Sequence, residues 1–211
     1  MKKIKFSNDL LKCYKDFLDN GKTERECVSQ IVDQAQAYGY KNIEDCETLQ
    51  AGDKVYVVKM NKSVALFEIG SESMEKGMNI LGAHIDSPRL DAKQNPLYEN
   101  THITYLNTHY YGGIKKYQWV TLPLAIHGVV CKKDGTTIKV CVGESDDDPV
   151  FCISDILPHL AQEQMKKGAA DFIKGEDLDV MIGCELACDD EKDDDKKDKK
   201  DKKKKKDSGK K

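Results

Sequence analysis

The sequence predicts a mixed α/β protein with more than one domain. Near the amino terminus apolar residues recur at helical spacing, and short β-type segments separated by turn residues follow them. The last residues of the chain, by contrast, carry no apolar side chain that could be buried. We therefore expect three regions: the opening part of a layered α/β domain at 1–89, a β-rich domain at 90–186, and a disordered Asp/Lys-rich tail at 187–211.

The first region is expected to contain helices and a pair of strands. Apolar residues at helical spacing predict a helix over 8–18. Thr23 and Glu26 form a capping box, in which each side chain can satisfy the other residue's unpaired backbone amide, and they predict the start of a second helix. Alternating and β-branched residues then predict strands over 55–60 and 64–69.

The second region is expected to be mostly β. Residues 117–131 are rich in β-branched and aromatic side chains, and the turn sequence at 133–135 returns the chain into a strand at 136–142. A short strand is predicted at 150–153. Residues 158–167 place their apolar side chains at helical spacing and predict a helix.

The most informative pattern is the pair His84 and Asp86. They follow an apolar run at 78–81, which predicts a buried strand, and side chains two residues apart on a strand share one face. One imidazole nitrogen can bind zinc while a carboxylate accepts the N–H of the other, and open α/β sheets place their sites at the carboxyl ends of strands. The alternative is a structural histidine, because a single His-x-Asp pair is a weak signal.

Charge and composition exclude several classes of function. The net charge is −3, and the stretch from Asp189 onward holds 12 lysines and 9 acidic residues, which leaves the rest of the chain at −6. An acidic body argues against a nucleic-acid surface, and aspartates interleave with the lysines around 202–206. No apolar stretch approaches the roughly 18 residues of a membrane span. We expect a cytoplasmic protein that binds neither nucleic acid nor membrane.

The cysteines are scattered and form no Cys-x-x-Cys pair. We expect them to be small buried hydrophobic residues in a reducing compartment, without a zinc site at Cys184 and Cys188. There are eight: Cys13, Cys27, Cys46, Cys131, Cys141, Cys152, Cys184 and Cys188.

Three segments resemble, in the same order, motifs of the aspartyl aminopeptidase family of two-zinc metallopeptidases. The first is 78–90, which contains Gly-Ala-His-Ile-Asp-Ser-Pro-Arg. The second is 110–119 with its continuation at 123–129, and the third is 156–161, with the tripeptide Pro-His-Leu. The resemblance covers residues 1–186.

The resemblance implies a fold and a function. It makes 1–89 the amino-terminal part of a catalytic domain, into which a β-rich dimerisation domain is inserted near Leu90. It makes His84 a zinc ligand and Asp86 a catalytic side chain that orients it. It also implies that His159 reaches the neighbouring subunit's active site and donates a hydrogen bond to the substrate carbonyl. His127 is expected to be a hydrogen-bonded core or interface histidine.

Two hypotheses about function remain open. In the first, the protein is a homo-oligomeric zinc aminopeptidase, and metal-activated water removes amino-terminal residues from peptides. In the second, the chain is a non-catalytic assembly fragment that keeps only the dimerisation surface. The second arises because the family's other metal ligands (a bridging aspartate, a glutamate, a second aspartate and a late histidine) and its glutamate base have no counterpart in this sequence. We therefore expect the 211-residue chain to be inactive by itself.

Overall fold

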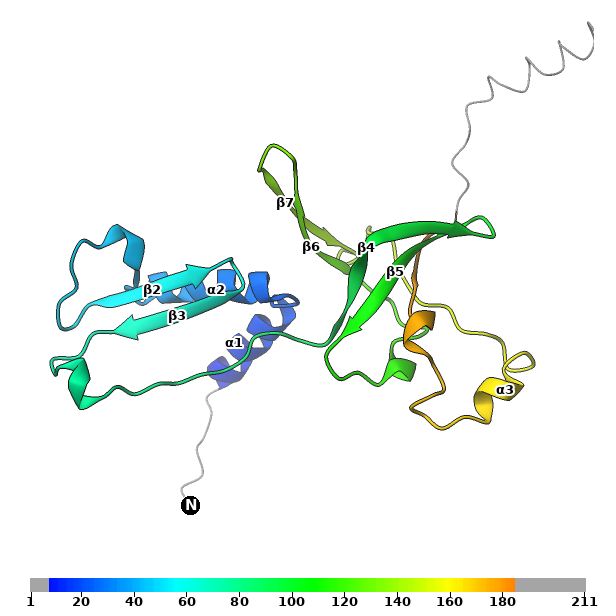
Figure 1. Ribbon diagram of the computed structural model, residues 1–211, viewed down its shortest axis with the longest axis horizontal. Coiled ribbons are helices and arrows are strands. Elements are labelled where there is room, and N and C mark those ends of the chain that lie inside the picture. The colour runs from blue at the N-terminus through cyan, green and yellow to red at the C-terminus, as the bar shows by residue number, and fades with distance from the viewer. Residues whose placement is uncertain (1–7, 185–211) are drawn as a thin grey trace, which may run out of the picture. The chain divides into compact units, whose positions relative to one another are not determined.

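The computed structural model describes residues 8–184, a mixture of helices and strands that divides into two compact units (Figure 1). Among the described residues, unit 1 comprises 8–91, 110–115 and 123–150, and unit 2 comprises 92–109, 116–122 and 151–184. The tail predicted to be disordered lies outside the described residues. No helix in the range 8–184 is long and apolar enough to cross a membrane.

Both predicted helices of unit 1 are present. Helix α1 spans Asn8–Asp19 and buries none of its residues. Helix α2 spans Glu24–Ala37 and begins at the predicted capping box, in which the amide of Glu26 donates to Thr23 Oγ1 (3.4 Å) and the amide of Thr23 donates to Glu26 Oε2 (2.8 Å). Helix α2 packs against the strands β2 and β3 and buries Cys27, Val28 and Ala35.

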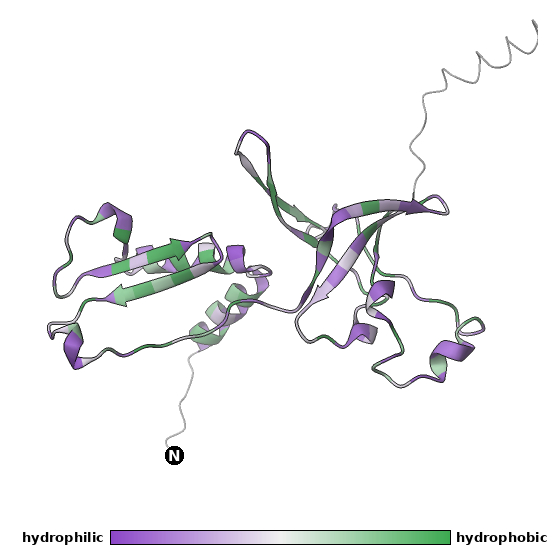
Figure 2. Ribbon diagram, in the orientation of Figure 1, coloured by the Kyte–Doolittle hydropathy of each residue, from purple (hydrophilic) through white to green (hydrophobic). Residues whose placement is uncertain are grey.

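The strands of this layer form a three-stranded sheet in the order β1-β2-β3. Strand β1 (Lys41–Asn42) runs parallel to β2 (Lys54–Lys59), and β2 pairs antiparallel with β3 (Ser63–Glu68). Hydrophobic residues make up most of β3 and the middle of β2 (Figure 2), where Val55 is almost fully buried. The two strands predicted from the sequence are therefore confirmed.

The buried strand predicted over 78–81 is wrong. Residues 77–88 have no regular secondary structure, and Met78, Ile80 and Leu81 are 65 %, 80 % and 100 % exposed. A strand needs a neighbour for its backbone hydrogen bonds, and no strand within 8–184 pairs with this segment. His84 and Asp86 consequently lie on an irregular segment.

A second sheet, in the order β4-β5-β8, was not predicted at all. It consists of β4 (Arg89–Asn100), β5 (Ile103–Tyr111) and β8 (Val180–Gly183). Strand β4 is difficult to recognise because it is polar and contains Pro96, a residue that normally weakens the prediction of a strand. Thr101 and His102, both with positive φ, form the tight turn that joins β4 to β5.

The core of unit 2 forms around β8 and the segments that contact it. The fully buried Leu178 accepts a hydrogen bond at its carbonyl from Thr108 Oγ1 (2.5 Å). Asp179 accepts from the amide of Thr108 (3.1 Å) and from the hydroxyl of Tyr98 (2.7 Å). Non-local contacts, and not local patterns, therefore define this unit.

Two predicted elements of unit 2 are much shorter than expected. The strand at 150–153 is reduced to isolated bridges at Phe151 and Cys152, the second of which pairs with Met181. The helix over 158–167 is reduced to α3 (Gln162–Met165), because residues 158–160 form a turn instead. Its apolar spacing does not produce a longer helix, since Leu160 and Met165 remain exposed and gain no burial there.

The last strand pair is the hairpin of β6 (Ile126–Cys131) and β7 (Thr137–Val142). The predicted turn is confirmed, with Gly135 at φ 87°, but the long strand predicted from residue 117 begins only at Ile126. Residues Lys116–Gln118 form a short 3-10 helix.

The seven cysteines within 8–184 are all free, and Cys27 alone among them is buried.

Candidate metal-binding site

His84 and Asp86 contact each other although the strand expected to align them is missing. Nδ1 of His84 lies 3.1 Å from Oδ1 of Asp86 and 3.1 Å from the backbone carbonyl oxygen of Asp86. A carbonyl oxygen can only accept a hydrogen bond, and so can a carboxylate that is ionised at neutral pH. Nδ1 must therefore carry the proton. Nε2 has no hydrogen-bond partner among residues 8–184, and the side chain of His84 is 84 % exposed.

Asp86 has a second partner, Tyr111, at the end of β5. The hydroxyl of Tyr111 donates to Oδ2 of Asp86 (3.1 Å), while His84 lies beside Oδ1. The hydrogen bond from Tyr111 is the largest influence on this carboxyl group and lowers the pKa of Asp86 below its usual range, and His84 acts in the same direction. The same hydrogen bond raises the pKa of Tyr111. Asp86 is thus held as an anion that faces an imidazole.

This arrangement fits one ligand of a zinc site. A neutral imidazole with its Nδ1 proton held by a carboxylate offers the Nε2 lone pair to a metal, the usual arrangement at zinc-binding histidines. A stable site needs three or four protein ligands. Within 8–184 no group of three or more His, Cys, Asp or Glu side chains could hold a metal ion. The described residues therefore provide one candidate ligand and a carboxylate that could orient it.

His159 is not at the start of a helix, as predicted, but on the exposed turn that precedes α3. The turn is closed by hydrogen bonds from the amides of Leu160 and Ala161 to the carbonyl oxygen of Leu157. His159 lies in unit 2 and His84 in unit 1, and each was predicted to act at an active site. The role of His159 remains a prediction.

His127 on β6 is hydrogen-bonded, as predicted. Its Nδ1 lies 2.8 Å from Glu26 Oε1, its Nε2 lies 2.9 Å from Glu144 Oε1, and its side chain is 12 % exposed. Burial by itself lowers the pKa of His127, but the hydrogen bonds to the two carboxylates outweigh burial and raise it. With both nitrogens occupied, this ring links the amino-terminal turn of α2 to the β6–β7 hairpin and is not a candidate metal ligand.

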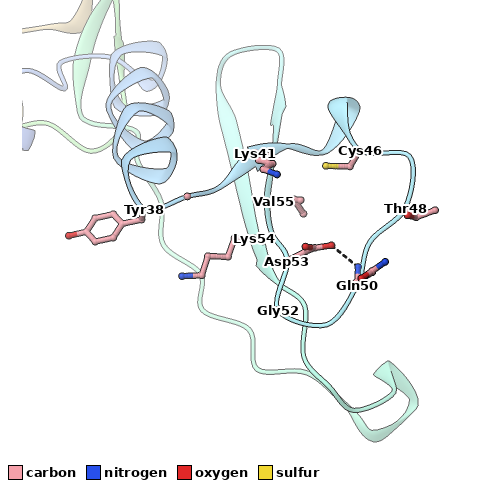
Figure 3. A pocket seen from close by; sticks show the side chains of 10 residues that line it. Tyr38, Lys41, Cys46, Thr48, Gln50, Gly52, Asp53, Lys54 and Val55 are labelled. Carbon is pink, nitrogen blue, oxygen red and sulfur yellow. Dashed lines mark hydrogen bonds between the residues drawn. The ribbon is translucent and has the colours of Figure 1, made fainter.

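The structure also contains an open hollow of about 550 Å³ beside the amino-terminal sheet (Figure 3). Its lining comes from the segment after α2, the loop that begins at Cys46, and the start of β2. Figure 3 shows the lining side chain of Lys54 and the carboxylate of Asp53, which accepts a hydrogen bond from the amide of Gln50 (2.6 Å). None of the predicted site residues lines this hollow, so we do not assign the active site to it.

Comparison with known protein families identifies the chain's relatives. The family model described as "Aminopeptidase I zinc metalloprotease (M18)" matches residues 17–209, which is most of the sequence. This chain belongs to the M18 aminopeptidase family. The family predicted from the three sequence motifs is thereby confirmed.

The M18 relatives are longer than this chain. A probable M18 family aminopeptidase 1 from Clostridium acetobutylicum is 62 % identical over 174 residues, which cover 81 % of this chain and 37 % of the relative. The crystal structure of aminopeptidase I from the same organism matches with a TM-score of 0.75 at 55 % identity, over 87 % of this chain and 41 % of that one. An M18 structure from Thermotoga maritima matches with a TM-score of 0.80 at 41 % identity, over 87 % of this chain and 40 % of that one. The chain thus spans about two fifths of the length of these relatives.

One residue of the candidate site was not predicted from the sequence. Tyr111 was not among the predicted site residues, but its hydroxyl contacts Asp86. No local pattern links residues 25 positions apart, because the contact depends on the pairing of β4 with β5. The one available signal is its place in the second family-like segment, directly before Gly112 and Gly113.

Proposed function

We propose that this chain contributes to a zinc-dependent M18 aminopeptidase that removes amino-terminal residues from peptides. The observation that carries this proposal is the geometry of His84, whose Nδ1 proton is held by Asp86 while Nε2 stays available. Membership of a family described as zinc metalloproteases supports zinc as the metal. Zinc, when bound, supplies Lewis acidity toward a peptide carbonyl and a water molecule.

Each site residue has a distinct role in this proposal. His84 binds zinc through Nε2, and Asp86 fixes the tautomer and the orientation of the ring. The remaining ligands of a two-metal site and the general base are not supplied by residues 8–184. In this proposal they come from the part of the M18 enzymes that this chain does not match, and the chain spans about two fifths of the length of its relatives.

The β-rich region of the chain is proposed to serve self-association. Residues 90–186 form the inserted dimerisation domain in this proposal, and His159 reaches the active site of the neighbouring subunit in the homo-oligomer. The exposed position of His159 on a turn supports this role, because the side chain is free to meet a partner surface or a substrate. There a donor beside the substrate carbonyl would stabilise the charge that develops on its oxygen. We propose a cytoplasmic location.

The proposed function can be tested by mutation. The protein is studied in the form in which its source organism produces it. Aminopeptidase activity on aminoacyl p-nitroanilides and zinc content after dialysis are measured for the unaltered protein, for His84→Ala and for the control His102→Ala. His102 is also an exposed histidine close to a carboxylate, that of Glu99. We expect His84→Ala to lose zinc and activity together while His102→Ala keeps both. Full activity with normal zinc content in His84→Ala would refute the role of His84.

The alternative function is that of a non-catalytic assembly fragment. It is favoured by the fact that no set of three or more metal-binding side chains comes together within 8–184. The same experiment separates the two functions. A gene product that ends at Lys211, holds no zinc and shows no turnover would support the fragment, whereas zinc-dependent turnover would exclude it.

A further inference from the structure

The carboxylate of Asp86 belongs to a chain of contacts that extends to the start of α2. Beyond Tyr111, the next member is Arg89, whose guanidinium carbon lies 4.0 Å from the centre of the Tyr111 ring. Nη1 of Arg89 donates to Oε1 of Glu24 (2.9 Å), and Nε donates to Oδ1 of Asp91 (2.7 Å). All these residues lie in unit 1.

The fold explains why these residues meet. Arg89 is the first residue of β4 and Tyr111 is the last residue of β5, and these neighbouring strands are joined by the tight turn at Thr101 and His102. The beginning of one strand and the end of the other therefore lie together. Gly112 follows with φ 79°, and a Cβ added to it would lie 3.7 Å from the Cα of Pro88. The end of β5 is thus held against the segment that carries Asp86.

Arg89 is fixed more firmly than the residues it supports. Its side chain is only 24 % exposed and that of Glu24 is 17 % exposed, whereas His84 is 84 % exposed. A guanidinium that donates to two carboxylates has a fixed plane, and this plane presents a flat, cationic face to the Tyr111 ring. The first turn of α2 is thereby linked, through Arg89, to the ring that carries the Tyr111 hydroxyl.

Asp86 itself has no such support from its own segment. Residues 77–88 have no regular secondary structure, so no ladder of backbone hydrogen bonds holds the carboxylate in place. Its two oxygens are shared between two donors, Tyr111 at Oδ2 and His84 at Oδ1. The hydroxyl of Tyr111 thus holds the carboxylate by Oδ2 while Oδ1 faces His84, where it adds to the carbonyl oxygen of Asp86 as an acceptor for Nδ1.

We infer that Tyr111 is a positioning residue for the proposed zinc ligand His84, and that Arg89, anchored by Glu24, holds Tyr111 in place. Tyr111 acts through Asp86: it keeps Oδ1 facing His84, which favours the Nδ1–H tautomer and leaves Nε2 unprotonated for the metal. This inference rests on the proposed function, because it assigns a purpose to the tautomer only if His84 binds zinc.

The tautomer of His84 tests the inference without any metal. In metal-free protein with ¹⁵N-labelled histidine, long-range ¹H–¹⁵N correlation spectra at pH 8.5 (well above the ordinary histidine pKa of about 6.5) distinguish the two tautomers. We expect mainly the Nδ1–H form in the unaltered protein and a severalfold lower ratio of Nδ1–H to Nε2–H in Tyr111→Phe. The control Tyr117→Phe removes the hydroxyl of an equally exposed tyrosine (38 % against 39 %) and should leave the ratio unchanged. An unchanged ratio in Tyr111→Phe would overturn the inference.

A second variant and a second measurement complete the test. Arg89→Lys keeps the positive charge but loses the planar face and one of the two hydrogen bonds, so it should shift the tautomer ratio in the same direction by a smaller factor. This result is expected even if Tyr111→Phe fails to fold, and an unchanged ratio would remove Arg89 from the chain of contacts. In the zinc-binding protein we expect Tyr111→Phe to weaken zinc affinity by about 10-fold, measured by competition with a chelating dye. The tautomer ratio could shift in Tyr111→Phe while His84→Ala still binds zinc with normal affinity. That combination would instead refute the proposed function itself.

Discussion

The single carboxylate of Asp86 faces two donors, and this makes it the residue on which the geometry of His84 depends. Asp86→Asn replaces the anion by a neutral amide of the same shape. In the complete enzyme we expect the fold to be kept and zinc binding to weaken by about 10–100-fold, because the amide is a poorer acceptor for the Nδ1 proton and does not enforce the tautomer. Zinc affinity and a circular dichroism spectrum measure the two effects.

The matched control for this substitution is Asp134→Asn. Asp134 is also an exposed aspartate whose pKa is lowered by hydrogen bonds, in its case from the side chain and amide of Thr136. It lies in the β6–β7 turn and should not affect zinc. Equal losses of zinc affinity in the two variants would show that the effect of Asp86→Asn is not specific to the site.

His127 gives a prediction about pH. Its pKa is raised in the folded protein because Glu26 and Glu144 favour the charged ring in spite of its burial. Its contribution to stability is therefore complete below the unfolded pKa of about 6.5 and is lost as the pH rises through the folded pKa. We expect His127→Gln to lower the free energy of unfolding by about 1–2 kcal/mol near pH 6, with a smaller loss at pH 9. Urea denaturation at the two pH values measures it.

The contact between His127 and Glu26 also weakens at low pH, because the carboxylate of Glu26 becomes protonated. Burial by itself raises the pKa of Glu26, but its hydrogen bonds with His127 and Thr23 outweigh burial and lower it. Its contribution is present above the unfolded pKa and is lost as the pH falls through the folded pKa. The exposed pair of His102 and Glu99, 3.8 Å apart, provides the control, and His102→Gln should change stability little at either pH. A loss from His127→Gln that is the same at pH 6 and pH 9 would contradict the linkage.

Among the secondary-structure elements, α2 depends most directly on its first residues. Thr23→Ala removes the hydroxyl that accepts from the amide of Glu26, while the amide of Thr23 still donates to the Glu26 carboxylate. We expect a loss of about 1 kcal/mol in the free energy of unfolding, with recovery in Thr23→Ser, which keeps the hydroxyl. Thermal and urea denaturation measure it. The corresponding change at Ser73, which caps only the short exposed 3-10 helix Met74–Lys76, should cost less.

At the scale of the whole molecule, the number of zinc ligands in the chain determines whether it can bind zinc and hydrolyse peptides by itself. We expect the isolated 211-residue chain to show no turnover of aminoacyl substrates and to retain no zinc after dialysis. One imidazole with one orienting carboxylate lacks the three or four ligands of a stable zinc site. Metal analysis and an activity assay with and without a chelator provide the measurement. One tightly held zinc ion per chain, or chelator-sensitive turnover, would contradict this expectation.

The proposed role of His159 belongs to the assembled oligomer. His159→Phe should leave the oligomer and its zinc intact but lower kcat, because the lost contact acts mainly in the transition state. Mixing these subunits with His84→Ala subunits tests whether the histidine acts across the interface. Each mixed dimer would then hold one site with both defects and one with neither, so that activity returns. If mixed dimers verified by mass spectrometry regain no activity, His159 does not act across the interface but within its own subunit.

The sequence by itself determined the elements that depend on neighbours in the chain. The capping box, α1, α2, the hairpin of β2 and β3, and the turn at Gly135 were all predicted, since caps, turns and short strand pairs depend on residues a few positions apart. The order of three motifs was also sufficient to predict the family. The proximity of His84 and Asp86 follows from the same locality, because only Ile85 separates them in the chain.

Only the tertiary structure decided the features that depend on distant residues. The pairing of β5 with β8 and the contact of Tyr111 with Asp86 join residues 25 or more positions apart. The failure of the predicted strand at 78–81 has the same origin, because an apolar run becomes a buried strand only where another part of the protein pairs with it and covers it. Local patterns fix what a segment can become, and its non-local partners decide what it becomes.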